Sequence, residues 1–114
     1  MNKYRDKSDF EINKVVAEYR KLNIIAYDQV GIVLLDDMNA TTFDPCNNPA
    51  DAMPIVIENG ISLIFDTGCK AWVAGIAYWV DGCEWQISYE VERMNQYRAA
   101  MELFLLMKDA ENEK

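Results

Sequence analysis

Carboxylate side chains gather in the middle of the sequence, where acid/base catalysis or a divalent cation would need them. Asp44, Asp51 and Glu58 lie within one segment, and the pair Asp36–Asp37 precedes it. Two carboxylates held close together can transfer protons or share a cation. Their spacing does not match a calcium-binding loop, and nothing in the sequence fixes their geometry. We therefore expect them to be solvated loop acids and helix caps, with no metal ion bound.

The three cysteines are the next candidates, either as nucleophiles or as zinc ligands. Cys46 lies in a loop rich in proline and asparagine, but the chain has no histidine to act as its base. Cys46, Cys69 and Cys83 lack CxxC spacing, and their odd number argues against a disulfide framework. Glycine-rich phosphate-binding motifs are absent as well. We predict three free thiols in a reducing cytoplasm, no cofactor and no enzymatic activity.

The central stretch NNPADAMPIV, residues 47–56, predicts a short helix with a defined start. Asn48 is expected to be the N-cap and Pro49 the first helical residue, where a missing N–H does no harm. Asp51 then suits the positive end of the helix dipole. Pro54 requires a kink or a restart, because its ring opposes the preceding turn.

Arg98 is a basic residue at the predicted start of another helix, where its charge opposes the dipole. We therefore expect a carboxylate partner, such as Asp51 or Asp44. Two interpretations stay open. In the one we favour, Arg98 is a clamp that ties the central loop to the helix. In the other, it forms an anion-binding or partner-binding polar site with Asn47 and Asp51.

Aromatic residues are concentrated in neighbouring predicted strands. Trp72 and Tyr78 would share one face of a strand, and Trp79 would lie on the other. Aromatic residues on both faces mean either a sheet covered on both sides or an exposed aromatic patch, which can mark a partner surface. We favour a core position for Trp85, and both interpretations stay open for Trp79.

The elements that position these residues follow from apolar periodicity and turn signals. A capping box at Ser8–Glu11 begins a helix that runs to about Leu22, and Asn95 caps a second long helix that runs to about Asp109. The five residues after Asp109 are expected to fray. Between the helices we predict these elements: one bulged strand or two short strands within 24–35, an ordered loop over 38–49, the short central helix, and strands over 61–65, 71–80 and 83–91.

The predicted meander ends in a strand with clear alternation. Cys83, Trp85, Ile87, Tyr89 and Val91 fall on one face, which we assign to the core, and a turn at residues 81–82 precedes it. The element order predicts an α+β fold in one domain, residues 1–114. It has an antiparallel sheet of about four to five strands, with the N- and C-terminal helices packed on one face and a short central helix.

Composition and charge exclude several classes of partner. The 114 residues are 51% hydrophobic, which is enough for a core, and 19 acidic against 11 basic residues give a net charge of −8. Direct binding to nucleic acid or to an anionic membrane needs clustered positive charge. A protein partner with a basic surface remains compatible. The N-terminus lacks a signal-peptide core, and the apolar runs are too short to span a bilayer.

Three colinear blocks resemble a known family: SDFEINKVVAE at residues 8–18, FDPCNNPADAMPIVIENGISL at 43–63 and YRAAMELFLLM at 97–107. The chain resembles the phage NinX family, small proteins of lambdoid phages and enterobacterial prophages, over most of its length. Met53 stands where that family usually has tryptophan. The resemblance implies a phage or prophage origin and action inside the bacterial host, and it brings no established activity.

Together these observations predict an accessory protein that works by binding a host or phage protein, one with a basic surface being compatible. The alternative is a small-ligand or nucleotide-binding domain that uses the central Asn/Asp loop and the Trp-bearing strands. The candidate binding residues are Asn47, Asn48, Asp51, Trp79 and Arg98. The oligomeric state is left open.

Overall fold

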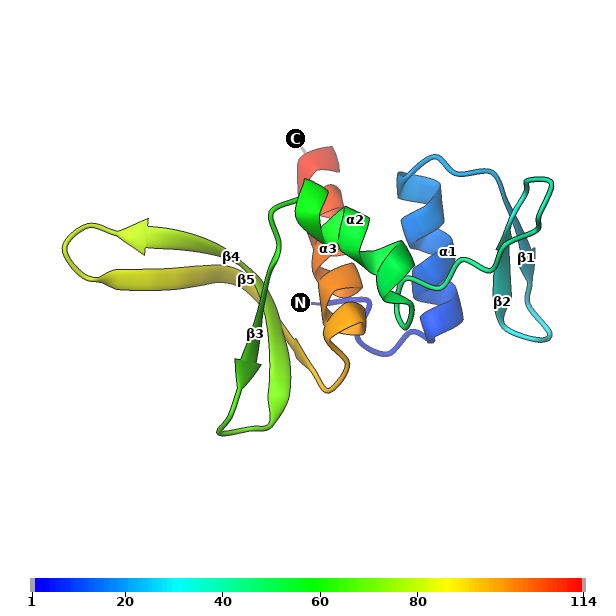
Figure 1. Cartoon of the computed structure of the whole chain (residues 1–114). Coiled ribbons are helices and arrows are strands. Elements are labelled where there is room, and N and C mark those ends of the chain that lie inside the picture. The colour runs from blue at the N-terminus through cyan, green and yellow to red at the C-terminus, as the bar shows by residue number, and fades with distance from the viewer. Residues whose placement is uncertain (1, 114) are drawn as a thin grey trace.

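Helix α3 (Gln96–Asn112) is the longest element and lies at the centre of the computed structural model, which describes residues 2–113 (Figure 1). The Asn95 side chain caps it by accepting from the N–H groups of Tyr97 and Arg98, at 2.9 and 3.3 Å. The helix ends later than predicted, because the Asn112 amide donates to the Tyr19 hydroxyl at 3.3 Å and ties the last turn to the body. Lys114 lies outside the described residues.

Helix α1 (Asp9–Tyr19) begins with the predicted capping box. The Glu11 N–H donates to the Ser8 hydroxyl at 3.1 Å, which satisfies one of the free donors of the first turn. Ile12 and Val16 are fully buried on the side that meets α3. The helix stops three residues before the predicted end at Leu22, since Lys21 takes a φ of 60° and turns the chain away.

The next segment forms two short strands, one of the two predicted alternatives. β1 (Ile24–Tyr27) and β2 (Ile32–Leu35) pair antiparallel as a hairpin, and Leu34 of β2 also forms a bridge with Thr42. Gly31 turns the chain with a φ of 70°, a conformation that glycine adopts without strain. Val33 is buried on the side that meets α1, so the hairpin extends the core beyond that helix.

Helix α2 (Pro49–Glu58) begins as predicted, with the Asn48 side chain accepting from the Ala50 N–H at 3.0 Å and Pro49 in the first turn. The helix runs through Pro54 without a restart. Gly60, with a φ of 64°, ends it. Ala52, Ile55 and Val56 are buried, and the helix packs on α3.

A three-stranded antiparallel meander completes the fold: β3 (Ser62–Asp66), β4 (Ala71–Val80) and β5 (Glu84–Arg93), in the order β3-β4-β5. Asp81 and Gly82 form the predicted turn, closed by a 3.0 Å bond from the Cys83 N–H to the Val80 carbonyl. β3 reaches only to Gly75, so beyond that point β4 and β5 run on as a two-stranded ribbon. Figure 1 shows this ribbon projecting away from the helices.

A β-bulge divides the β4–β5 hairpin. Ala74 pairs with Val91 and Ile76 with Ser88, so one residue of β4, Gly75, lies opposite two of β5, Tyr89 and Glu90. Tyr89 takes a φ of 60° there. The extra residue reverses the alternation of side chains along β5. Val91 therefore lies on the face toward α3, whereas Trp85 and Ile87, before the bulge, lie on the opposite face.

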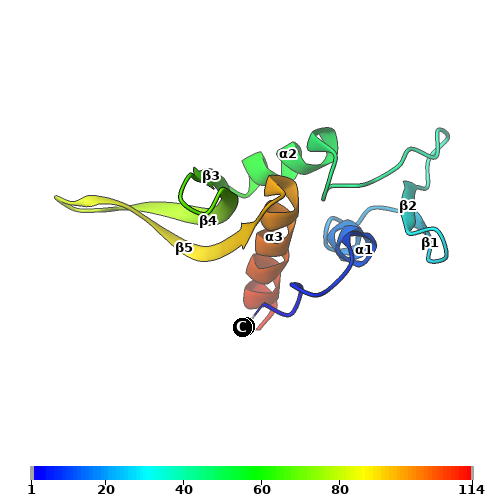
Figure 2. The ribbon, with the colours of Figure 1, turned by 90° about the horizontal axis from the view of Figure 1, so that it is seen from below.

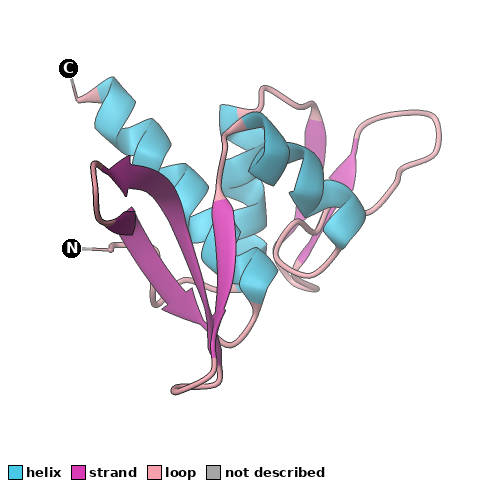
Figure 3. Ribbon diagram, turned by 60° about the vertical axis from the view of Figure 1, so that its left-hand side comes forward, coloured by secondary structure: helices cyan, strands magenta, loops and turns pink. Residues whose placement is uncertain are grey.

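The mixed α+β class is confirmed, and the described residues contain five strands in two antiparallel sheets rather than one. Of the helices, α3 makes the extensive contacts with the meander, while α1 packs on α3 and β2 (Figures 2 and 3). The two sheets therefore lie on opposite sides of the helical layer. Buried side chains from the helices, β2 and the base of the meander form the core: Ile12, Val16, Val33, Ile55, Val56, Ala74, Val91, Met101, Leu103, Phe104 and Leu105.

Gly75→Ala tests the bulge geometry. A Cβ at this position would lie 2.1 Å from Ile87 Cγ2, so strands or side chains must shift. We expect a loss of about 2 kcal/mol in the free energy of unfolding, typical of an overpacked site. Urea unfolding measures it.

Ile87→Ala in the same background is the matched control, because it removes the atom that clashes. The double variant should lose clearly less than the sum of the two single variants. Additive losses would contradict the proposed contact.

Candidate functional site

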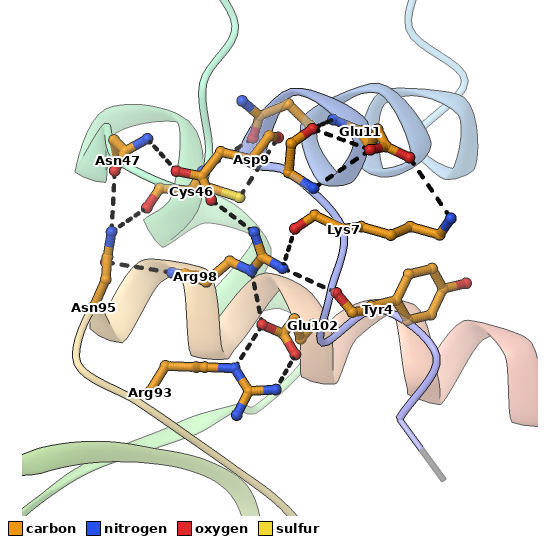
Figure 4. Close-up of polar contacts among 12 residues, drawn as sticks. Tyr4, Lys7, Asp9, Glu11, Cys46, Asn47, Arg93, Asn95, Arg98 and Glu102 are labelled. Carbon is orange, nitrogen blue, oxygen red and sulfur yellow. Dashed lines mark hydrogen bonds and ion pairs between the residues drawn. The ribbon is translucent and has the colours of Figure 1, made fainter.

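A buried carboxylate, Glu102, lies at the centre of the largest polar cluster (Figure 4). Its side chain is fully buried and accepts four hydrogen bonds. Arg93 Nη2 and Nε donate at 2.6 and 2.9 Å, Arg98 Nε at 2.7 Å and the Asn2 amide at 2.7 Å. Burial would raise the pKa of Glu102, but the bonds from Arg93, Arg98 and Asn2 outweigh it and hold that pKa below its ordinary value.

Arg98 is a clamp, but it does not hold the central loop as the sequence suggested. Its Nη1 donates to Asp9 at 2.7 Å, and its Nη2 donates to the carbonyls of Tyr4 and Lys7 at 2.9 and 2.7 Å. The prediction that Asp51 or Asp44 would be its partner was wrong. Glu102 one turn along α3 and Asp9 neutralise the charge instead, so Arg98 ties the N-terminal segment to α3.

Asp9 also brings Asn47 into the cluster. Asn47 Nδ2 donates to Asp9 at 3.1 Å, while its oxygen accepts from Asn95 at 3.0 Å. Asn95 donates further to the Cys46 carbonyl at 2.8 Å. Asn47 and Arg98 thus meet at one carboxylate, as Figure 4 shows. No motif pointed to Asp9 beyond its place in the first turn of α1.

The other predicted loop residues lie beside this cluster and have local roles. The Asp51 carboxylate accepts from the Asp44 N–H at 2.9 Å, and Asp44 accepts from Asn13 at 2.8 Å. Asn48 is the cap of α2. These contacts hold the central loop against α1 and α2.

The loop cluster has little free volume and few free polar groups for a ligand. A cavity of about 170 Å³ lies against Asp9, Asn13, Asp44 and Asn47, below the usual size of a small-molecule pocket. Its polar side chains already bond one another, and within residues 2–113 every buried side-chain nitrogen and oxygen has a partner. Burial, and then the nearby charge of Asp9, raise the pKa of the Cys46 thiol, so it stays protonated.

The cysteines do not come together. Cys46 is buried in the loop cluster, whereas Cys69 and Cys83 are exposed in the two turns of the meander. In the part of the chain that the structure describes, Asp66, Cys69 and Glu92 are the group whose potential metal ligands lie within 4.8 Å of one another. The charges of Asp66 and Glu92 raise the pKa of Cys69.

A second cluster ties the C-terminal half of α3 to the N-terminal half of the chain. The Tyr4 and Tyr19 hydroxyls both donate to Asp109, and Lys3 lies 3.3 Å from the same carboxylate. Burial would raise the pKa of Asp109, but the bonds from Tyr19, Tyr4 and Lys3 bring it below its ordinary value. The same interaction, added to burial, raises the pKa of Tyr4.

Trp79 lies apart from both polar clusters, on the ribbon that we call the arm, residues 76–88. Every residue from 77 to 86 is exposed. Trp79 and Trp85 pair directly across the strands and contact edge to face, with ring centroids 5.5 Å apart. They remain 51% and 67% exposed. The structure therefore separates Trp79 from the other four candidates. Asn47 and Arg98 meet at Asp9 (Figure 4), and Asn48 and Asp51 lie beside Asn47 in the loop.

The prediction of a core position for Trp85 was wrong, as was the core face assigned to β5. Cys83 is exposed and Tyr89 is 57% exposed, while Val91 is buried. Trp85 is exposed because the arm extends beyond the body and neither of its faces is covered, while the bulge at Tyr89 puts Val91 on the opposite face, toward α3. No sequence signal marked the bulge, since Gly75 lies on the partner strand.

The arm makes the molecule elongated. The radius of gyration is 15.0 Å, against about 13 Å for a compact domain of this length. The principal extents are 52 × 34 × 25 Å. Among residues 2–113, no helix is both long and apolar enough to cross a membrane.

These features define an acidic α+β protein with a rigid polar centre and a projecting aromatic hairpin. The family model described as Bacteriophage P22, NinX matches residues 3–108, nearly the whole chain, and the chain belongs to that phage family. The resemblance seen in the sequence is thereby confirmed. No curated protein and no solved structure matches it.

Glu102→Gln tests the buried cluster. The substitution removes the charge that holds Arg93 and Arg98 in a buried place, so we expect the free energy of unfolding near neutral pH to fall by about 3 kcal/mol. Glu111→Gln is the matched control, because among residues 2–113 Glu111 pairs with Lys108 alone, on the surface, and it should change stability by less than about 0.5 kcal/mol. Equal effects in urea unfolding would contradict a central role for Glu102.

Glu102 and Asp109 make the free energy of unfolding depend on pH. The pKa values of Glu102 and Asp109 lie below their ordinary values of 4.5 and 3.8, so the unfolded chain takes up protons first. Their stabilisation is fully present above those ordinary values and is lost as pH falls through the lower, folded-state values. Urea unfolding from neutral to acid pH should show this fall, with a smaller slope in Glu102→Gln and an unchanged slope in Glu111→Gln. A pH-independent stability would contradict it.

Proposed function

We propose that this phage protein acts by binding another protein, in the cytoplasm of the bacterial host, and that the arm is its binding element. No catalytic role is part of the proposal. The observation that carries it is the exposed Trp79–Trp85 pair on a ribbon without cover on either face. Large exposed aromatic residues are costly to leave in water, and they are the residue types that dominate binding energy at protein interfaces.

The arm also suits binding because its base is ordered before a partner binds. Its base is fixed, since Arg93 at the end of β5 bonds to the buried Glu102, so the strands are held in place before any partner arrives. A tryptophan side chain has few rotatable bonds and loses little entropy on contact. A two-stranded ribbon is only marginally stable alone, and a partner that covers it would stabilise it.

Photo-crosslinking in bacterial cells that carry the encoding phage or prophage tests this proposal. Benzoylphenylalanine in place of Trp79 should give discrete crosslinked products, because the arm contacts a partner. The matched control is the same substitution at Ile57, which is 73% exposed on α2, far from the arm in sequence. We expect that control to give no product.

Trp85→Thr, added to the crosslinking chain, should reduce the yield, since it removes half of the aromatic pair and keeps a β-favouring residue. Equal crosslinking from positions 79 and 57, or none from either, would contradict a binding role for the arm.

A further inference from the structure

Among the described residues, the outer edge of β5 is unpaired along the whole strand, whereas the β4 edge is free only beyond Gly75. The strand order places β5 at an edge of the meander, and within residues 2–113 no other strand pairs with that side of it. An unpaired edge presents a row of backbone N–H and C=O groups, which an extended segment of another chain can complete.

This edge lacks the protection that edge strands usually carry. Lysine, proline and bulges discourage strand addition. In β5 the bulge lies at the base, at Tyr89 and Glu90, so the five residues Glu84–Ser88 form a regular strand beyond it. Those five residues include no lysine, arginine or proline. The unprotected edge is therefore on the arm and clear of the body.

The two faces of this strand differ in chemistry. Trp85 and Ile87 lie on the face with Trp79 and Ala77, which is apolar. Glu84 and Gln86 lie on the other face, paired with Val80 and Tyr78. A strand added beside β5 places alternate residues next to these two sets, since side chains alternate along a strand. Its apolar residues would contact Trp85 and Ile87, and its other residues would face Glu84.

The charge of the hairpin determines which residues of the added strand are favoured opposite Glu84. From residue 71 to residue 92 the hairpin carries Asp81, Glu84, Glu90 and Glu92 and no basic residue. A basic residue opposite Glu84 gains a favourable cross-strand pair, and an acidic one is repelled. A guanidinium can also rest on the exposed face of a tryptophan ring.

A second copy of the chain fits this edge less well. It would bring four more acids of the same hairpin beside these four, on a chain whose net charge is −8. Most of the chain's basic side chains already pair with its own carboxylates, including Lys3, Lys14 and Arg20. The molecule therefore offers little positive surface to a second acidic arm.

We propose that β5 binds its partner by strand addition, with the edge Glu84–Ser88 accepting an extended protein segment in which basic and apolar residues alternate. This rests on the proposed function and specifies its partner and its geometry. The apolar residues would pack on Trp85 and Ile87, and a basic residue would pair with Glu84.

Defined peptides test this with the purified full chain. The probe is a blocked seven-residue peptide that alternates arginine with valine, and its matched control has glutamate in place of arginine. Tryptophan fluorescence should report binding of the arginine peptide, with the glutamate peptide at least about tenfold weaker. Added salt should weaken the binding.

Two further measurements separate strand addition from simple attraction of charges. An arginine–valine peptide N-methylated at every residue has no backbone N–H group left to donate, and it should lose binding although its charge is the same. Amide exchange by NMR should show new protection at residues 84–88. Glu84→Gln should weaken binding, while Glu111→Gln on α3 should leave it unchanged.

The outcomes distinguish the two proposals. Equal binding of the methylated peptide, or protection confined to another element, would overturn strand addition. Self-association of the free chain that protects residues 84–88 would make a second copy the occupant and would also overturn it. If position 79 crosslinks in cells but no β5 amide gains protection with the arginine peptide, strand addition fails and the binding role of the arm stands. If neither is seen, both fail.

Discussion

A charged carboxylate without contact to water constrains the whole structure. Glu102 keeps its charge only because Arg93, Arg98 and Asn2 donate to it together, and each comes from a different part of the chain. Arg98 extends the network to Asp9 at the start of α1. Through these bonds the N-terminal segment, α1, α3 and the end of β5 are placed relative to one another. Removing either arginine leaves the buried carboxylate with weaker compensation, so the cluster strongly favours a single arrangement.

This cluster holds the base of the arm, whereas the tip of the arm is exposed. Arg93 fixes the end of β5, and the bulge opposite Gly75 separates the part of the hairpin that packs on α3 from the part that does not. Beyond Gly75 the exposed Trp79–Trp85 pair is the main side-chain contact between the strands. The protein thus combines a body whose polar groups are satisfied internally with an appendage whose apolar surface is not. This contrast is what makes the arm, rather than the loop around Asn47, the place for a partner.

Local signals predicted the local features well. The capping box at Ser8, the caps at Asn48 and Asn95 and the turn at Asp81–Gly82 involve residues a few positions apart, and all are present. The loop site was predicted only in part. Asn47 and Arg98 do meet, but through Asp9, 38 and 89 positions away in the chain. Trp85 is exposed because β4 and β5 continue beyond the end of β3, and the bulge opposite Gly75 changes the face of Val91. Pairings over such distances leave no periodic trace in a single sequence.

Native-state hydrogen exchange of the free chain tests the division between body and arm most directly. We predict that amides of residues 99–105 in α3 exchange only when the whole molecule unfolds. Amides of residues 77–86 should exchange through local opening at a much lower free energy, because no side chain from the body covers them. Equal protection of the arm and α3 in the monomeric chain would contradict it, since the arm would then belong to the folding unit and would not be an open binding element.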